Sequence, residues 1–139
     1  MIYLGLDLGS KTLGLAISDR TSTIATSLDV IRYETKEELF SKLEDVVINK
    51  NVDIFVLGNP LNLDGSLSKR SEETLEFKSE LENKFNKSVI MQDERLSTVE
   101  AERMLISNDT KRKNRKKVID KIAATIILQG YLDRKNNER

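Results

Sequence analysis

The sequence predicts an α/β protein built on one five-stranded mixed sheet flanked by helices. Three closely spaced apolar runs open the chain, and runs with this spacing favour an antiparallel meander. After residue 35 the hydrophobic pattern alternates between helical and strand periods, which predicts αβ units. The chain has 139 residues, the usual size of one domain, so we expect a single domain over residues 1–139.

The first three strands follow from short apolar runs separated by tight links. The run 2–8 is mostly apolar and ends at Gly9, which suits a strand buried on both faces. A second run, 12–18, follows a link of hairpin length. A third run, 23–31, is rich in β-branched residues and follows a turn at 19–22. These three strands are expected to pair antiparallel.

The rest of the chain alternates between helices and strands. Thr35 and Glu38 fit a capping box, and they predict a helix over 36–50. A fourth strand is expected at 53–58, followed by a loop at 59–66. The remaining predicted elements are a helix over 68–86, a strand over 88–92, a helix over 97–107 and an amphipathic, strongly apolar helix over 118–134.

The chain contains no Cys and no His, which excludes several kinds of chemistry. It has no disulfide, no thiolate nucleophile and no Cys-ligated metal site. It also has no Ser-His-Asp triad and no imidazole general base. Catalysis would therefore depend on carboxylates, Lys, Arg, hydroxyls or backbone groups. Oxygen donors of this kind favour a hard divalent cation, Mg²⁺ or Mn²⁺.

Three acidic residues lie where the pattern predicts apolar neighbours. Asp7 is near the carboxyl end of the first strand, and Glu94, beside Asp93, directly follows the fifth. Asp120 lies on the stripe of the last helix that also carries Ala124 and Ile127. A buried carboxylate is costly unless it is paired or binds a metal. Two strand ends and one helix therefore predict a cluster of catalytic metal ligands at one edge of the core.

Each of these acids also has a simpler structural explanation. Asp7 could accept hydrogen bonds from the turn at 9–12, and the pair Asp93 and Glu94 could form a salt bridge with Arg95. Asp120 could be a favourable charge at a helix N-terminus. Taken singly these explanations stay open, and the joint placement of the three acids favours a metal site.

The net charge of zero conceals a strong asymmetry along the chain. Residues 111–139 carry ten basic and three acidic residues, and residues 1–110 carry 13 basic and 20 acidic residues. The basic stretch 111–117, expected to be mobile, predicts a contact with a nucleic-acid backbone, although a solvated loop would have the same composition. The candidate nucleic-acid-binding residues are Arg95, Lys113, Arg115, Lys116 and Lys117. The loop at 58–66 could hold a phosphate, but a turn followed by a helix N-cap is the preferred interpretation.

Four blocks of sequence resemble the YqgF/RuvX family. They are Leu4-Gly5-Leu6-Asp7-Leu8-Gly9-Ser10-Lys11 with Gly14-Leu15-Ala16-Ile17-Ser18-Asp19, Val56-Leu57-Gly58-Asn59-Pro60 with Asp64-Gly65-Ser66, Asp93-Glu94-Arg95-Leu96-Ser97-Thr98, and the block from Asp120 to Gln129. Their order and spacing cover nearly the whole chain. The resemblance implies an RNase H-like fold and a nuclease that processes the 5′ end of pre-16S rRNA during ribosome biogenesis.

The same resemblance implies an acidic triad at Asp7, Glu94 and Asp120, with Asp93, Ser10 and Lys11 as secondary candidates. The expected partners are structured RNA within a ribosome precursor, or branched DNA. The alternatives are a Holliday-junction resolvase, which would act as a homodimer, and a non-catalytic RNA-binding assembly factor. A sugar-kinase or actin-like ATPase would need two such domains, which 139 residues do not supply. The chain itself is expected to be a monomer or a homodimer.

The sequence shows no sign of a membrane or secretory role. No apolar run approaches the length of a membrane span. The first ten residues lack a basic region and include Asp7, so we expect no signal peptide and a cytoplasmic location.

Overall fold

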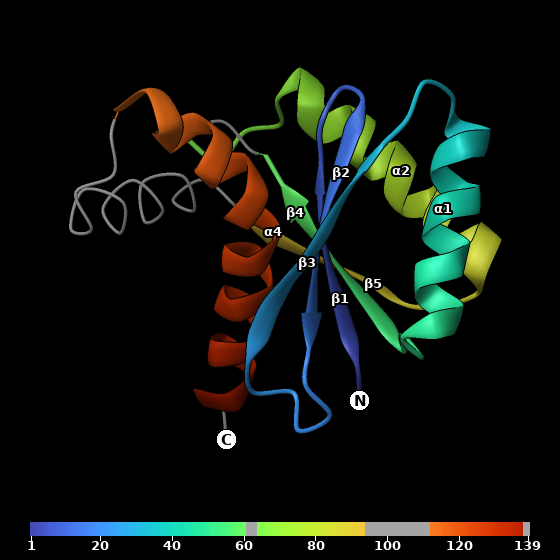
Figure 1. The fold of residues 1–139 in the computed structure, drawn as a ribbon, viewed down its shortest axis with the longest axis vertical. Coiled ribbons are helices and arrows are strands. Elements are labelled where there is room, and N and C mark those ends of the chain that lie inside the picture. Colours follow the sequence, from blue (N-terminus) through green and yellow to red (C-terminus); the bar gives the residue numbers. More distant parts are fainter. Residues whose placement is uncertain (61–63, 94–111, 138–139) are drawn as a thin grey trace.

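One mixed sheet forms the centre of the computed structural model, which describes residues 1–60, 64–93 and 112–137 (Figure 1). The description does not include the side chains of residues 112–121. The strands are β1 (Tyr3–Leu8), β2 (Thr12–Ser18), β3 (Ala25–Arg32), β4 (Ile54–Asn59) and β5 (Val89–Asp93). The helices of the described part are α1 (Lys36–Asn49), α2 (Lys69–Phe85) and α4 (Arg112–Asn137). The predicted α/β class and five-stranded sheet are confirmed.

The strand order is β3-β2-β1-β4-β5, with β1 at the centre. β1 pairs antiparallel with β2, and β2 pairs antiparallel with β3, as the meander predicts. β1 pairs parallel with β4, and β4 pairs parallel with β5. The carboxyl ends of β1, β4 and β5 therefore lie at the same edge of the sheet, where ligand sites of α/β proteins collect.

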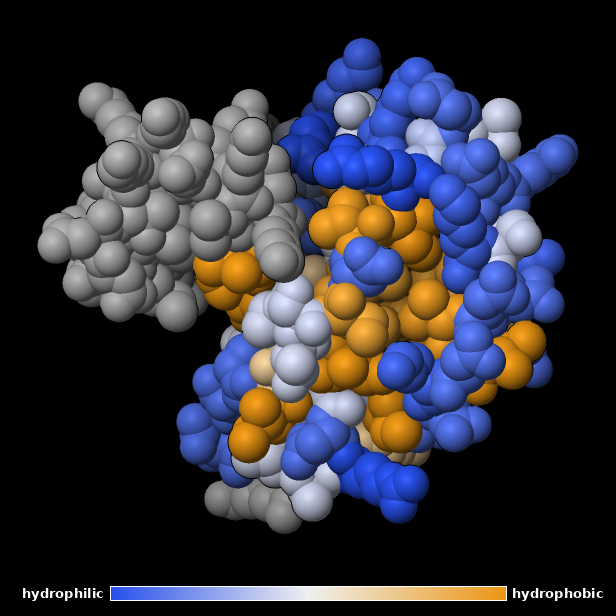
Figure 2. All heavy atoms as spheres, in the orientation of Figure 1, coloured by the Kyte–Doolittle hydropathy of each residue, from blue (hydrophilic) through white to orange (hydrophobic). Residues whose placement is uncertain are grey.

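Helices cover both faces of the sheet and enclose two apolar clusters. Figure 1 shows α4 on one side of the strands and α1 and α2 on the other. Leu4, Leu6 and Leu57 belong to the larger cluster, under α1 and α2. Tyr3 and Val56 belong to the smaller one, which α4 covers with Ala124, Ile127, Leu128 and Leu132. Figure 2 shows hydrophobic side chains filling the middle of the viewed face, with hydrophilic residues around them.

Side-chain caps fix the starts of α1 and α2. The Thr35 side chain accepts a hydrogen bond from the Glu38 amide, as the predicted capping box requires. The reciprocal bond is shifted by one residue, because the Glu38 carboxylate accepts a hydrogen bond from the amide of Glu34 and not of Thr35, so the predicted capping box forms only in part. At the start of α2, the Ser68 hydroxyl accepts a hydrogen bond from the Ser71 amide at 3.0 Å. The Ser71 hydroxyl in turn accepts one from the Ser68 amide at 2.6 Å.

The third strand begins two residues later than predicted. The Asp19 carboxylate accepts hydrogen bonds from the amides of Thr23 and Ile24, at 2.8 and 3.0 Å. These amides are therefore held in the β2–β3 loop, and strand pairing starts at Ala25.

The prediction of a mobile stretch at 111–117 followed by a helix from 118 is wrong for residues 112–117. α4 begins at Arg112 and continues to Asn137, three residues past the predicted end. Lys and Arg are good helix formers, and no Gly or Pro occurs between residues 112 and 118, so the helix extends through the basic residues. The predicted helix over 97–107 lies outside the described residues.

Candidate active site

Asp7 lies on the central strand, half-buried, on the face of the sheet that α4 covers. Successive side chains of a strand alternate between its two faces. Tyr3 packs in the cluster under α4, whereas Leu4 and Leu6 pack under α1 and α2. Asp7 has the same parity as Tyr3, so its carboxylate belongs to the α4 face, two residues beyond Gly5.

Gly5 allows α4 to lie directly against β1. A methyl group at Gly5 would be 2.7 Å from the Leu128 Cβ and 3.0 Å from the Ala124 carbonyl oxygen. Farther along, the Tyr3 and Tyr131 rings lie 5.6 Å apart. The strand and the helix therefore run in opposite directions, with Tyr3 level with Tyr131 and Gly5 level with the turn from 124 to 128. Ala124, whose small side chain also permits this close approach, is fully buried.

The same register gives an expected position for the backbone of Asp120. Two strand residues advance about 6.6 Å, and four helical residues advance about 6 Å. One further step from Gly5 reaches Asp7 on β1 and the turn from 120 to 124 on α4. The α4 backbone is helical there, and the Asp120 side chain is outside the described part.

β5 brings a third chain segment to this edge. Gly58 on β4 pairs with Gln92, and Asn59 pairs with Asp93. The Gln92 side chain accepts a hydrogen bond from the Arg134 guanidinium of α4 at 2.8 Å, so Gln92 also belongs to the α4 face. Alternation then assigns Asp93, which is exposed, to the opposite face. Glu94 and Arg95 lie outside the described residues.

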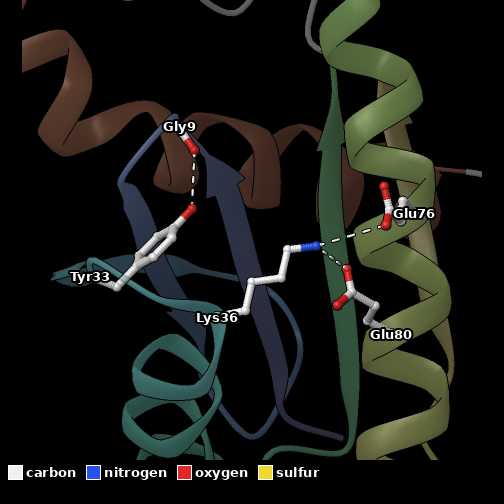
Figure 3. Close-up of polar contacts among 5 residues, drawn as sticks. All are labelled: Gly9, Tyr33, Lys36, Glu76 and Glu80. Carbon is white, nitrogen blue, oxygen red and sulfur yellow. Dashed lines mark hydrogen bonds and ion pairs between the residues drawn. The ribbon is translucent and has the colours of Figure 1, made fainter.

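The turn after Asp7 is held by groups that the sequence reasoning missed. Its own backbone bond runs from the Gly9 amide to the Thr12 carbonyl at 2.7 Å. The Arg70 guanidinium of α2 donates to the Leu8 carbonyl oxygen at 2.7 Å. The Tyr33 hydroxyl donates to the Gly9 carbonyl oxygen at 3.3 Å (Figure 3). Arg70 is 62 residues from Leu8, and no local pattern signals such a contact.

Tyr33 and Lys36 both have pKa values above their ordinary range. Burial raises the pKa of the Tyr33 hydroxyl, so Tyr33 keeps its proton, and its hydrogen bond to Gly9, to a higher pH than an exposed tyrosine does. The hydrogen bond that the Lys36 ammonium donates to the Glu80 carboxylate raises the pKa of Lys36. Figure 3 shows Lys36 of α1 reaching across to Glu80 and Glu76 of α2, at 2.7 and 4.0 Å. These ion pairs connect α1 to α2.

The secondary candidates Ser10 and Lys11 are both exposed in the β1–β2 turn. Lys11 forms an ion pair with Glu34 at 2.9 Å. In the loop predicted either to hold a phosphate or to form a turn, the Asp64 carboxylate accepts hydrogen bonds from the amide and hydroxyl of Ser66. That arrangement is a local turn, which agrees with the preferred interpretation.

The side chains of Lys113, Arg115, Lys116 and Lys117 are outside the described part of the chain, although their backbone belongs to α4. Among the residues whose side chains are described, no three carboxylates gather into a metal-binding group. The described part also contains no helix long and apolar enough to cross a bilayer.

Comparison with known proteins identifies the family. The family model RuvX, described as "Holliday junction resolvase", matches residues 1–134. The chain belongs to the RuvX family. A RuvX relative from Bacillus pumilus is 49% identical over 138 residues, covering 98% of this chain and 100% of the relative. A second, from Geobacillus kaustophilus, is 46% identical over 137 residues, covering 97% and 99%. Both carry the name "Putative pre-16S rRNA nuclease".

Solved structures with little sequence identity share the fold of this RuvX chain. The Holliday junction resolvase of fowlpox virus matches with a TM-score of 0.58 at 16% identity, covering 96% of this chain and 99% of that one. RuvC of T. thermophilus, in complex with a Holliday junction substrate, matches with a TM-score of 0.56 at 12% identity, covering 97% and 96%. The RNase H-like fold implied by the sequence is confirmed.

Proposed function

We propose that this RuvX protein is a nuclease that hydrolyses phosphodiester bonds of structured RNA, at the 5′ end of pre-16S rRNA in the cytoplasm. Full-length relatives at 46–49% identity carry a name with that activity. The observation that carries the proposal is Asp7, a half-buried carboxylate at the carboxyl end of the central strand and on the face under α4.

Three acids form the proposed catalytic centre. Asp7 and Gln92 share the α4 face, and continued alternation beyond β5 would put Glu94 on that face too. The register of α4 against β1 would bring the turn that begins at Asp120 level with Asp7. Asp93 has the opposite parity, which favours Glu94 as the ligand from this segment.

The donor set suits a divalent cation. Carboxylate oxygens are the ligands that Mg²⁺ and Mn²⁺ prefer, and a cation removes the repulsion between neighbouring carboxylates. Asp7, Glu94 and Asp120 would hold it. When bound, such a cation activates a water molecule and stabilises the leaving oxygen of a phosphodiester. The chain contains no His, so the proton of the attacking water would pass to a carboxylate, a Lys or a hydroxyl and not to an imidazole.

Basic residues next to this centre would bind the nucleic-acid backbone. Lys113, Arg115, Lys116 and Lys117 lie in the first two turns of α4, on the approach to Asp120. Arg95 follows Glu94 directly. We assign all five a contact with phosphates, which orients the substrate without reading its sequence.

A resolvase acting on branched DNA is the second candidate, because the matching family model is described as a Holliday junction resolvase. The chemistry would be the same at both substrates. Cutting two strands symmetrically would require two copies of the chain, so this function predicts a homodimer on the junction.

A cleavage assay with matched substrates tests both functions. The substrates are a pre-16S 5′ leader transcript, a four-way DNA junction and single-stranded DNA, each with Mg²⁺ or Mn²⁺. We expect wild type to cut the leader transcript and the Asp7→Asn variant to be inactive. Preferential cutting of the junction would support the resolvase. No cleavage of any substrate would refute the nuclease proposal and favour a non-catalytic assembly factor. Normal cleavage by Asp7→Asn would refute the catalytic centre.

A further inference from the structure

Arg70 connects the first turn of α2 to the strand that carries Asp7. Its guanidinium donates from Nη2 to the carbonyl oxygen of Leu8 at 2.7 Å. Leu8 directly follows Asp7, and consecutive Cα atoms are about 3.8 Å apart. The contact therefore holds a positive charge at the carboxyl end of β1, while the Arg70 side chain remains exposed.

The Arg70 charge is not neutralised by a carboxylate in the described part of the chain, where no carboxylate oxygen lies within 4.0 Å of it. Two other cations around the turn differ in this respect. Lys11 pairs with Glu34 at 2.9 Å, and Lys36 pairs with Glu80 at 2.7 Å. One carbonyl oxygen uses one of the five N–H donors of an arginine, so four donors remain for another acceptor.

Fold stability alone gives a weak reason for this contact. A hydrogen bond from a charged donor is stronger than a neutral one, but at an exposed position the entropy lost in ordering a long arginine side chain offsets much of its contribution. An exposed strand-end carbonyl can instead be satisfied by water. A planar guanidinium held in place by its anchor is, however, well suited to bind two oxygens of one phosphate group.

We propose that Arg70 binds a backbone phosphate of the nucleic-acid substrate, next to the phosphodiester that would be cut at Asp7. This inference rests on the proposed nuclease function and adds a substrate contact from α2, on the other side of β1 from the basic residues of α4. The Leu8 carbonyl fixes the guanidinium relative to Asp7. Arg70 therefore positions the substrate along the strand end and takes no part in proton transfer.

Binding to a catalytically silent protein tests this role separately from cleavage. The affinity of Asp7→Asn for a fluorescent pre-16S leader transcript and for a four-way DNA junction is measured by anisotropy over a series of salt concentrations. The same measurement is made with Arg70→Gln and Arg70→Lys added. The control is Lys84→Gln, which removes the same charge about 21 Å farther along α2. Thermal melting of each variant reports on folding.

We expect Arg70→Gln to weaken binding roughly tenfold or more and to reduce the slope of log affinity against log salt by about 0.7 to 0.9. Arg70→Lys keeps the charge and is expected to keep the slope while losing part of the affinity. Lys84→Gln is expected to change neither. This pattern supports the proposal even if wild type cuts no substrate, in which case only the nuclease function fails.

Three results would overturn the proposal. The first is unchanged affinity and slope in Arg70→Gln, whether or not its melting temperature falls. The second is an equal loss of affinity in Arg70→Gln and Lys84→Gln, which would show a general charge effect. The third is an absence of binding to both nucleic acids by the parent Asp7→Asn protein. Normal cleavage by wild type together with the first result would leave the nuclease function intact and remove only Arg70 from the site.

Discussion

Replacing Gly5 with alanine puts a methyl group into the contact that sets the distance between α4 and β1. The new carbon would be 2.7 Å from the Leu128 Cβ and 3.0 Å from the Ala124 carbonyl oxygen. Carbon atoms pack at about 3.5–4.0 Å, so the two elements must separate by about 1 Å. Both neighbouring atoms are fixed to the helix backbone, and no change of rotamer relieves the clash. α4 itself has to move away from the strand.

That movement has a cost in stability and a larger cost in activity. Overpacking of a tight core destabilises a protein by about 1–3 kcal/mol. With an unfolding entropy of about 2.1 cal/mol/K per residue over 139 residues, the melting temperature should fall by roughly 3–10 °C. A displacement of about 1 Å between catalytic groups can reduce the rate about 100-fold. We expect the cleavage rate of Gly5→Ala to fall about 100-fold while its affinity for RNA stays the same.

Gly130→Ala is the matched control on the same helix. Its added methyl would be 3.4 Å from the Gln92 Nε2, the end of a flexible side chain. Alanine is favoured over glycine in a helix by roughly 0.8–1.0 kcal/mol, so this variant should melt slightly above wild type and cleave normally. If Gly5→Ala melts at the expected lower temperature but cleaves like wild type, then the distance between α4 and β1 does not position the catalytic groups. An unchanged melting temperature would refute the overpacking itself.

Three further predictions concern the rest of the chain. Changing all four basic residues, Lys113, Arg115, Lys116 and Lys117, to Gln should weaken RNA binding. The slope of log affinity against log salt should fall by up to about 0.9 per lost phosphate contact, and an unchanged slope would show that these side chains do not contact phosphates. Gln129→Ala removes the acceptor of the Ala25 amide and the donor to the Thr23 carbonyl, so urea denaturation should show a loss of about 1–3 kcal/mol; stability within error of wild type would contradict this role. Asp19→Asn tests a carboxyl whose pKa is lowered from 3.8 to about 2, mainly by the Thr21 hydroxyl and then by backbone amides. A lowered pKa stabilises the fold above pH 3.8, and the benefit disappears as the pH falls toward 2, so the stability difference from wild type should shrink over that interval. A constant difference would show that Asp19 does not titrate in this way.

Much of the fold follows from local patterns in the sequence. The run 12–18 is β2 to the residue, and the capping residue Thr35 correctly begins α1 at Lys36. Hydrophobic period and capping are properties of neighbouring residues, so they can be read without the tertiary structure. The position of Asp7 near the carboxyl end of β1 follows in the same way, whereas its face is known only from the helices that pack on each side of the strand.

Features that depend on contacts between distant segments were not predictable in this way. The sequence placed the start of the last helix at residue 118, because charge density suggested a solvated loop, whereas α4 starts at Arg112. The side chains of Tyr33 and Arg70 bond to carbonyls 24 and 62 residues away. Their partners are backbone carbonyls, which every residue has, so no sequence pattern indicates these contacts. The grouping of Asp7, Glu94 and Asp120 stays a prediction, since it depends on side chains outside the described part.

The position of α4 at the end of the element order has a consequence for synthesis on the ribosome. All five strands precede α4 in the chain, so the sheet can pair while α4 is still being made. Until then the face with Tyr3, Ala16 and Val56 has no helix over it, and such a surface invites association with other nascent chains. When α4 docks, it covers this face, and in the same event it would bring Asp120 to the proposed catalytic centre. If Asp120 belongs to that centre, a partly synthesised chain exposes an apolar surface but cannot cut RNA, and hydrolysis begins only once α4 covers that surface.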